Sequence, residues 1–225
     1  MWASAAAYFS PSHRVIAPDL RGYGETPLRP EDFSNADDVV ELLDHLGVDR
    51  ATVVGASFGG RCALELATLY PGRVERLVLL APAFRELGST PTVDALDEQE
   101  EALLKAGDID GAVELEVTTW LGPEASEEAR ALLRVMQRRA YDVYLAVEAA
   151  GGEPSSARVD VDPAAVAADT LIVSGRHDVD LFQSIARHLA ATIPSARLVE
   201  LAWAGHLPSL ERPEEVNALL AEFVG

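Results

Sequence analysis

Five short apolar runs recur along the chain, and helical patterns separate most of them. The runs are RVIAP at 14–18, ATVVG at 51–55, RLVLLAP at 76–82, TLIVSG at 170–175 and ARLVELA at 196–202. Continuous apolar runs of this length are typical of strands that are buried on both faces. Alternation of such strands with helices requires right-handed crossovers between parallel neighbours. We therefore predict an α/β fold with a mostly parallel sheet and helices on both faces.

The alternation is interrupted once, between the third and fourth runs. Residues 84–168 carry acidic helical patterns in place of strands. A single insertion at this position leaves the sheet at its carboxyl edge, where α/β proteins place their sites. We predict a core formed by residues 1–83 and 169–225, and an all-helical cap formed by residues 84–168. A solvated helical appendage is the alternative.

The second run leads into a glycine-rich segment, GASFGGRC at residues 55–62. Its outer glycines have the spacing of a phosphate-binding P-loop, but Arg61 and Cys62 stand where that loop needs Lys and Ser or Thr. The dinucleotide motif G-x-G-x-x-G also fails, because Ser57 replaces its second glycine. The segment does match G-x-S-x-G, in which a sharp strand-to-helix turn exposes the serine hydroxyl.

The G-x-S-x-G reading makes Ser57 a candidate nucleophile. We expect a side chain at Gly55 or Gly59 to crowd the turn, because the flanks of a strained serine pack closely. The alternative is an ordinary glycine-rich turn whose serine only caps the following helix.

A serine alcohol needs a base to take its proton and a third group to orient that base. Asp178 follows the fourth apolar run, in SGRHDVD, and His206 follows the fifth, in AWAGHLPSLERPEEV. Loops at the carboxyl ends of parallel strands meet at one edge of the sheet. The order Ser57, Asp178, His206 is the order of α/β-hydrolase triads.

With these motifs the chain resembles α/β-hydrolase-fold serine hydrolases of the compact, helical-capped type, which includes esterases, lactonases and carbon–carbon bond hydrolases. The resemblance covers nearly the whole chain and rests on HRVIAPDLRGYGETP, VVGASFGG, LIVSGRHD and AGHLPSLERPEEV. It implies acyl transfer, with Ser57 as nucleophile, His206 as base, Asp178 as orienting acid and the backbone N–H of Phe58 as an oxyanion donor. No cofactor is required.

The resemblance leaves three functions open. An esterase or lactonase is favoured, a carbon–carbon hydrolase of vinylogous diketones comes second, and a hydrolase-like binding protein with impaired turnover comes third. Serine at position 57 argues against the related dehalogenases and epoxide hydrolases, which use a carboxylate nucleophile. We expect Trp120 and Trp203 to be wall residues of an apolar pocket, or else ordinary core residues.

The resemblance also predicts a segment that this sequence does not contain. Related proteins carry, ahead of the RVIAPDL strand, a further strand that ends in a His-Gly loop with the second oxyanion donor. We expect the chain to be an N-terminally incomplete version of a longer hydrolase, with that strand belonging between RVIAP and ATVVG. We expect a chain without that strand to be unstable or weakly active. The alternatives are that RVIAP pairs directly with ATVVG or that a second chain fills the slot.

Charge and composition limit the partners. The chain has 37 acidic and 18 basic residues, for a formal net charge of −19, which disfavours nucleic acid and anionic membranes. One cysteine, Cys62, cannot form an intrachain disulfide, which fits the cytoplasm. We expect a small ester-like substrate and no metal, and leave a homodimer open. The HDVD segment at 177–180 has no further metal-binding residues with ligand spacing beside it. The DIDG turn at 108–111 resembles the start of a calcium-binding loop, but Val117 stands where such a loop needs its closing acidic residue.

Overall fold

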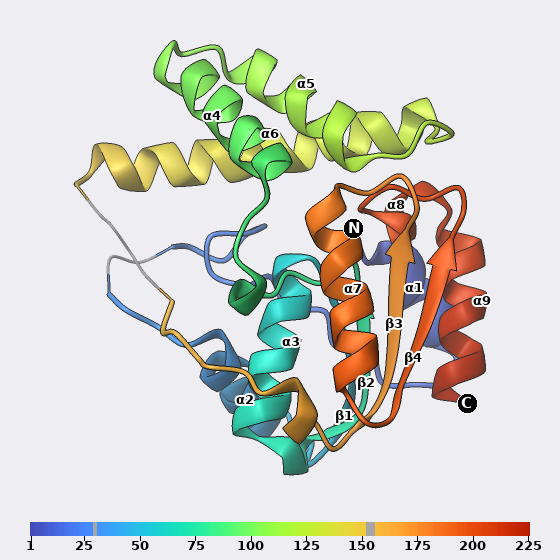
Figure 1. The fold of residues 1–225 in the computed structure, drawn as a ribbon. Coiled ribbons are helices and arrows are strands. Elements are labelled where there is room, and N and C mark those ends of the chain that lie inside the picture. Colours follow the sequence, from blue (N-terminus) through green and yellow to red (C-terminus); the bar gives the residue numbers. More distant parts are fainter. Residues whose placement is uncertain (29–30, 152–155) are drawn as a thin grey trace.

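A computed structural model describes residues 1–28, 31–151 and 156–225 of the chain (Figure 1). Its sheet has four parallel strands in the order β1-β2-β3-β4. They are β1 (Ala51–Ala56), β2 (Val74–Leu80), β3 (Asp169–Gly175) and β4 (Ala196–Leu201). The parallel sheet is therefore confirmed, and four of the five apolar runs are its strands.

The prediction of a strand at RVIAP is wrong. Residues 14–18 have no regular structure and are mostly exposed, with Val15 at 40% exposure. The segment does not pair with β1; it lines a hollow of about 680 Å³ together with Val39 and Leu42 of α2 (Asn35–His45). A strand needs a neighbour for its N–H and C=O groups, and a segment without one leaves these groups to water.

Helices cover both faces of the sheet, as predicted. One face packs against α2, α3 (Phe58–Leu69) and α7 (Asp180–Thr192), and the other packs against α1 (Ala3–Phe9) and α9 (Pro213–Val224). Successive residues of β2 alternate between these two cores: Leu77 and Leu79 lie in the first, Val78 and Leu80 in the second. All four of these side chains are fully buried, so the second half of the strand is a continuous apolar run that faces both cores.

Residues 91–149 contain three long helices. We call α4 (Pro91–Lys105), α5 (Ile109–Trp120) and α6 (Glu127–Ala149) the helical layer. Figure 1 shows the layer beyond the carboxyl ends of the strands. Each of the three helices is capped at its start by a side chain, from Thr90, Asp108 and Ser126 respectively. The DIDG segment is thus a helix start, since Asp108 accepts the N–H of Gly111 at 2.9 Å.

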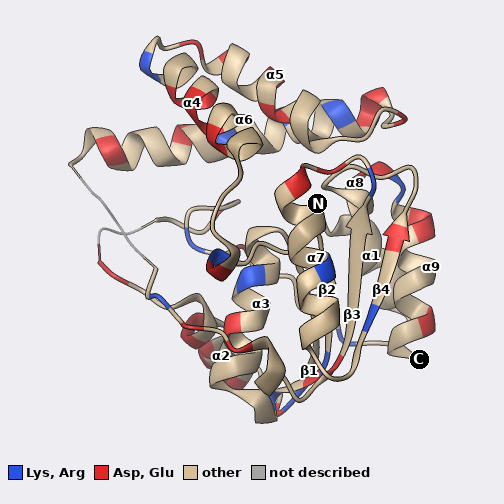
Figure 2. Cartoon of the chain, in the orientation of Figure 1, with Lys and Arg blue, Asp and Glu red and all other residues tan. Residues whose placement is uncertain are grey.

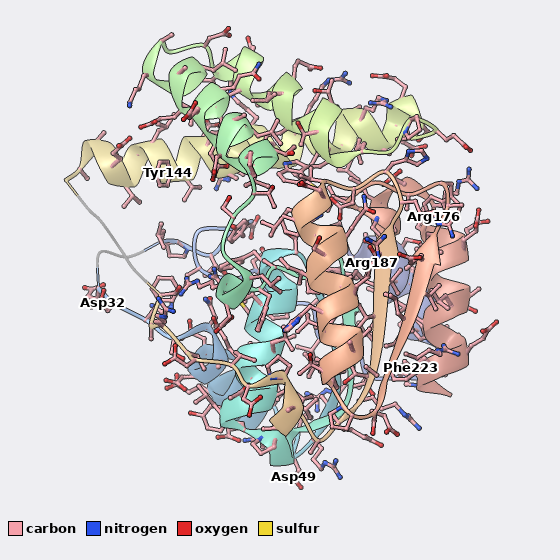
Figure 3. All side chains as sticks on the ribbon, viewed as in Figure 1. Asp32, Asp49, Tyr144, Arg176, Arg187 and Phe223 are labelled. Carbon is pink, nitrogen blue, oxygen red and sulfur yellow. The ribbon has the colours of Figure 1, made fainter. Side chains whose placement is uncertain are left out.

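Acidic residues are spread over α2, the helical layer and α9 rather than gathered at one place (Figure 2). Basic residues form exposed ion pairs with acidic ones, such as Arg187 of α7 with Glu200 of β4 at 2.9 Å. Figure 3 labels Arg187 on α7. Exposed pairs of this kind stabilise a fold by at most about 1 kcal/mol each. None of the described helices has the length and apolar character needed to cross a membrane.

Candidate active site

Ser57 joins β1 to α3 in a strained backbone conformation, with φ 49° and ψ −117°. Three backbone hydrogen bonds hold it there: its N–H donates to Leu80, and its carbonyl accepts from Arg61 and Ala83. Among the residues that the structure describes, its side chain makes no capping hydrogen bond to α3. The interpretation of Ser57 as a simple helix cap is therefore wrong. A serine at positive φ persists only where its surroundings impose it.

The glycines around Ser57 are required unequally. A Cβ on Gly55 would lie 2.3 Å from the carbonyl oxygen of Gly59, which confirms the predicted crowding there. A Cβ on Gly59 would meet nothing within 4 Å, so the same prediction for Gly59 is wrong. The crowded partner is instead Gly60, where a Cβ would lie 2.8 Å from Cβ of Pro82. The elbow therefore packs against the loop after β2 through the residue that follows the motif.

Asp178 and His206 are brought together at the carboxyl ends of β3 and β4. Nδ1 of His206 lies 2.9 Å from Oδ2 and 3.0 Å from Oδ1 of Asp178. The histidine side chain is 4% exposed and the aspartate side chain is 0% exposed. A carboxylate can only accept, so Nδ1 carries the proton and Nε2 is left with a free lone pair. Such a tautomer can act as a base.

The other acids near the site have different partners. The carboxylate of Asp180 accepts hydrogen bonds from Thr90 and Thr92 at 2.9 and 3.4 Å, at the entrance to the helical layer. The carboxylate of Glu86 accepts the N–H of Val161 at 3.2 Å. Asp178 is therefore the acid that contacts His206. Among the described residues, no group of three His, Cys, Asp or Glu side chains could hold a metal ion.

Two aromatic rings enclose the imidazole of His206. The ring centroid of Trp120, the last residue of α5, lies 4.6 Å away, and that of Phe182 on α7 lies 4.2 Å away. The two rings contact each other edge to face at 5.6 Å. Trp120 is one of the two expected wall residues, whereas the sequence analysis missed Phe182. Its position four residues after Asp178, on the first turn of a helix, is the signal that would have found it.

Trp203, the second expected wall residue, has different neighbours. It packs in the hydrophobic cluster that α1 and α9 form with the sheet. The guanidinium of Arg212 lies 4.6 Å from its ring centroid. These contacts are those of a core residue, and its role as a pocket wall stays a prediction.

A partly buried acid, Glu116, contacts Trp120 within the helical layer. Nε1 of Trp120 donates to Oε2 of Glu116 at 2.5 Å. Burial raises the pKa of Glu116 to about 7, with Glu100 and Asp97 acting in the same direction and the Trp120 hydrogen bond opposing them. The Glu116 carboxyl therefore loses its proton at a much higher pH than an ordinary glutamate does.

Phe58 stands directly after Ser57, as the first residue of α3. Backbone N–H groups in the first turn of a helix have no partner within it, so the Phe58 N–H is available as a donor. The Phe58 ring is stacked on Tyr23 at 5.6 Å and lies under the guanidinium of Arg61 at 4.5 Å. These contacts fix the start of the helix.

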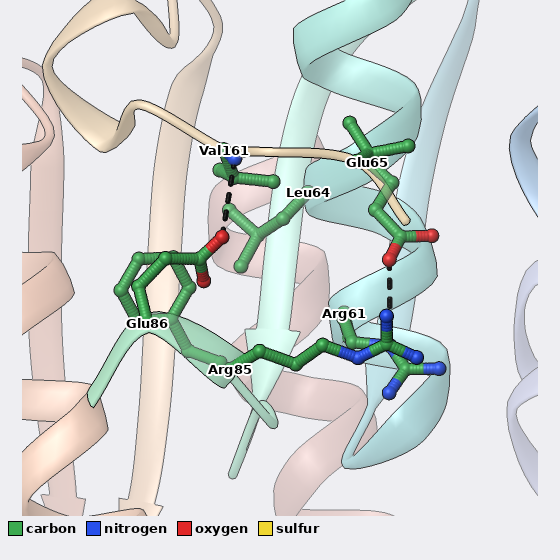
Figure 4. Close-up of a pocket in the computed structure, with 8 residues that line it drawn as sticks. Arg61, Leu64, Glu65, Arg85, Glu86 and Val161 are labelled. Atoms are coloured by element: carbon green, nitrogen blue, oxygen red, sulfur yellow. Dashed lines mark hydrogen bonds and ion pairs between the residues drawn. The ribbon is translucent and has the colours of Figure 1, made fainter. Parts of the chain in front are cut away.

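Arg61 is one of four charged residues among the eight that line a small hollow beside α3 (Figure 4). Its Nε lies 3.4 Å from Oε1 of Glu65, and both side chains are largely buried. Burial lowers the pKa of Arg61, and the nearby Arg85 lowers it further. The hollow has no room for a water molecule, so it does not form a second site. Its lining residues pack against α3.

Several known proteins with similar sequences are hydrolases. A 2-hydroxymuconate semialdehyde hydrolase of Pseudomonas sp. (strain CF600) is 29% identical, over an alignment that covers 99% of this chain and 80% of the relative. The 3-oxoadipate enol-lactonase 2 of Acinetobacter baylyi is 27% identical, over 96% of this chain and 80% of the relative.

Solved structures with the same fold include Est816, described as an N-acyl homoserine lactone degrading enzyme. Its TM-score is 0.80 at 28% identity, over 99% of this chain and 87% of that protein. The sequence pattern of the alpha/beta hydrolase family matches residues 1–219. Because that match spans almost the whole sequence, the chain belongs to the alpha/beta hydrolase family.

Proposed function

We propose that this protein is a serine hydrolase that cleaves a small ester or lactone through an acyl-enzyme on Ser57. The observation that carries the proposal is the buried hydrogen bond between His206 and Asp178, at the sheet edge to which the strained turn of Ser57 also belongs. A strained serine and a buried imidazole with an orienting carboxylate are the parts that nucleophilic acyl transfer requires.

The reaction proceeds in two halves. Oγ of Ser57 attacks the substrate carbonyl while Nε2 of His206 takes the hydroxyl proton, and the oxyanion that forms accepts the N–H of Phe58. The tetrahedral intermediate collapses, His206 returns the proton to the leaving alkoxide, and the acyl group stays on Ser57. Water then attacks the acyl-enzyme with His206 again as base, which releases the acid and restores the serine. Asp178 keeps the imidazole in the required tautomer and stabilises its charged form.

The walls of the site favour a neutral, apolar acyl group. Trp120 and Phe182 present aromatic surface next to His206. A formal charge of −19 repels anionic substrates over the whole surface.

We further propose that residues 84–168 act as a cap that excludes water from this site. The single cysteine, Cys62, is buried with its pKa raised to about 12, which fits a reduced thiol of a cytoplasmic protein.

Carbon–carbon bond hydrolysis is the second candidate. It is favoured by the similarity to the 2-hydroxymuconate semialdehyde hydrolase. The same triad would serve both reactions, so the substrate separates them. A panel of neutral p-nitrophenyl esters and lactones, assayed beside an anionic vinylogous diketone, distinguishes the two functions by kcat/KM.

A fluorophosphonate probe tests the nucleophile directly. We expect one adduct per chain, on Ser57, and no adduct in Ser57→Ala, which should fold normally and lack esterase activity. A probe adduct on another residue, or undiminished turnover in Ser57→Ala, would contradict the proposal. Labelling of Ser57 without turnover of any substrate would favour a hydrolase-like binding protein.

A further inference from the structure

Glu211 is a buried carboxylate that the mechanism above does not use. It ends the short helix α8 (Pro208–Glu211), which follows His206, and is 8% exposed. Its Oε1 accepts the N–H of Gly205 at 2.9 Å, and its Oε2 accepts the N–H of Gly122 at 3.0 Å. A carboxylate is rarely buried unless hydrogen bonds compensate for the lost hydration. Here each oxygen takes a backbone donor from a different part of the fold.

The two donors belong to segments that are distant in sequence. Gly205 directly precedes His206, whereas Gly122 lies in the turn between α5 and α6 of the helical layer. A second hydrogen bond joins the same segments, since the N–H of His206 donates to the carbonyl of Trp120 at 2.8 Å. The backbone of the His206 loop is thus connected to the end of α5 twice, once through the carboxylate of Glu211 and once by a direct hydrogen bond.

The contact between these segments leaves no space for a side chain. A Cβ on Gly205 would lie 2.5 Å from the nitrogen of Gly122, and a Cβ on Gly122 would lie 2.6 Å from Oε2 of Glu211. Two leucines add to the junction: Leu207, just before α8, and Leu210, within it, pack in the hydrophobic core of the helical layer. The loop of His206 is therefore anchored to the helical layer as well as to the sheet.

We infer that Glu211 is a positioning residue: its carboxylate fixes the His206 backbone against the end of α5, so that the imidazole stays on Asp178 and the Trp120 ring stays on the imidazole. The inference rests on the proposed function in one respect, that His206 is the base. Without the carboxylate, two buried N–H groups lose their acceptor and the two segments separate. The imidazole then moves with its loop, and small displacements of a reacting group reduce turnover strongly.

Opposing effects act on the charge of Glu211, and their balance raises the pKa of its carboxyl group. Burial is the main cause that raises its pKa, and Asp178 adds to the rise. The N–H groups of Gly205, Gly122 and Leu207 oppose both effects. Donors surround the carboxylate, so glutamine is an imperfect substitute: its oxygen satisfies one N–H, while its NH₂ group meets the other donor.

The test compares Glu211→Ala and Glu211→Gln with Leu220→Ala, which removes a buried α9 side chain from the other face of the sheet. All are assayed at a temperature where each is fully folded. We expect kcat to fall by ~10²-fold in Glu211→Ala and ~10-fold in Glu211→Gln with KM nearly unchanged. Leu220→Ala should keep the wild-type kcat despite a lower Tm. Equal kcat in the Glu211 variants and Leu220→Ala would overturn the inference.

A spectroscopic readout makes the test independent of turnover. The Nδ1 proton of His206, shared with Asp178, should give a low-field NMR resonance in the resting protein, and this signal should broaden or vanish in Glu211→Gln but persist in Leu220→Ala. Its persistence in Glu211→Gln would contradict the inference even if no substrate were turned over. Failure of the proposed function would instead appear as an unlabelled Ser57 in a wild-type protein that retains the resonance.

Gly122→Ala approaches the same contact from the helical layer and serves if Glu211→Ala does not fold. Its added methyl group would lie 2.6 Å from Oε2 of Glu211 and 2.6 Å from the carbonyl oxygen of Trp203, so it should push the His206 loop away from the end of α5 and lower kcat. The losses in kcat should be non-additive in the double variant, because both changes separate the same two segments. Additive losses would show that Glu211 and Gly122 act separately and would overturn the inference.

Discussion

The imidazole of His206 and the carboxylate of Asp178 form a buried pair, with Nδ1 2.9 Å from Oδ2. The pair is assembled in the free protein, and the N–H of Val179 also donates to Oδ1 of Asp178 at 2.7 Å. The orientation of the proposed base therefore does not depend on substrate binding. Preorganised groups of this kind avoid the cost of ordering during the reaction.

Replacing Asp178 should be far more damaging than replacing Asp180. Asp178→Asn removes the acceptor that fixes the His206 tautomer, and such a change typically lowers turnover by ~10⁴-fold. Asp180→Asn only weakens the hydrogen bonds from Thr90 and Thr92 and should cost less than about tenfold. Steady-state kcat of the two purified variants decides the matter. The assignment of Asp178 is wrong if Asp180→Asn is the more impaired.

Trp120 and Trp203 should differ in what their removal changes. Trp120→Ala deletes an aromatic contact to His206 and should lower kcat/KM by about tenfold. Trp203→Ala deletes packing against α1 and α9 and should lower Tm by about 4 °C or more while kcat/KM stays within about twofold of wild type. Activity and melting curves measured on the same samples test both. A large loss of activity in Trp203→Ala would restore it as a pocket wall.

Stability should fall as the pH rises through the titration of Glu116. The pKa is about 7 in the folded protein and 4.5 ordinarily, so between these values the folded state keeps a proton that the unfolded chain releases. The contribution of Glu116 to the free energy of unfolding is therefore fully present below about pH 4.5. It decreases as the pH rises, and up to about 3 kcal/mol of it is lost above pH 7. Urea unfolding of wild type and Glu116→Gln at pH 5 and pH 8 measures the effect.

Glu116→Gln should lose this part of the pH dependence, because it cannot ionise and its oxygen still accepts from Trp120. Glu114→Gln is the matched control on the same helix, since Glu114 is exposed and pairs with Arg134. We expect the control to keep the wild-type difference between the two pH values. Parallel changes in wild type and Glu116→Gln would mean that Glu116 is ionised throughout this range.

Alanine should be tolerated at Gly59 and not at Gly60. The methyl group of Gly60→Ala meets Pro82 at 2.8 Å, and such overpacking costs about 1–3 kcal/mol. Gly59→Ala enters open space within α3 and should stabilise the helix by up to about 1 kcal/mol. Chemical denaturation of the two variants provides the comparison. Equal stabilities would show that the loop carrying Pro82 yields without cost.

Much of this site could be predicted from short stretches of sequence. The segment around Ser57 encodes its own strand, turn and helix, and Asp178 and His206 each stand directly after an apolar run. The error at RVIAP has the opposite origin. An apolar run has the composition of a strand whether or not a neighbouring strand exists to pair with it, and here the run does not pair with β1.

Local backbone preferences and the period of apolar residues were enough to predict the four strands of the sheet, their order and the loops that carry the proposed triad. Which residues meet in space depends on the tertiary structure. The tertiary structure brings Phe182 and Trp120 against His206. It makes Gly60, and not Gly59, the glycine that has no space for a side chain. It also joins Glu211 to Gly122 by a hydrogen bond across 89 residues of sequence. Contacts over such separations depend on how helices and loops pack on the sheet, which no local pattern specifies.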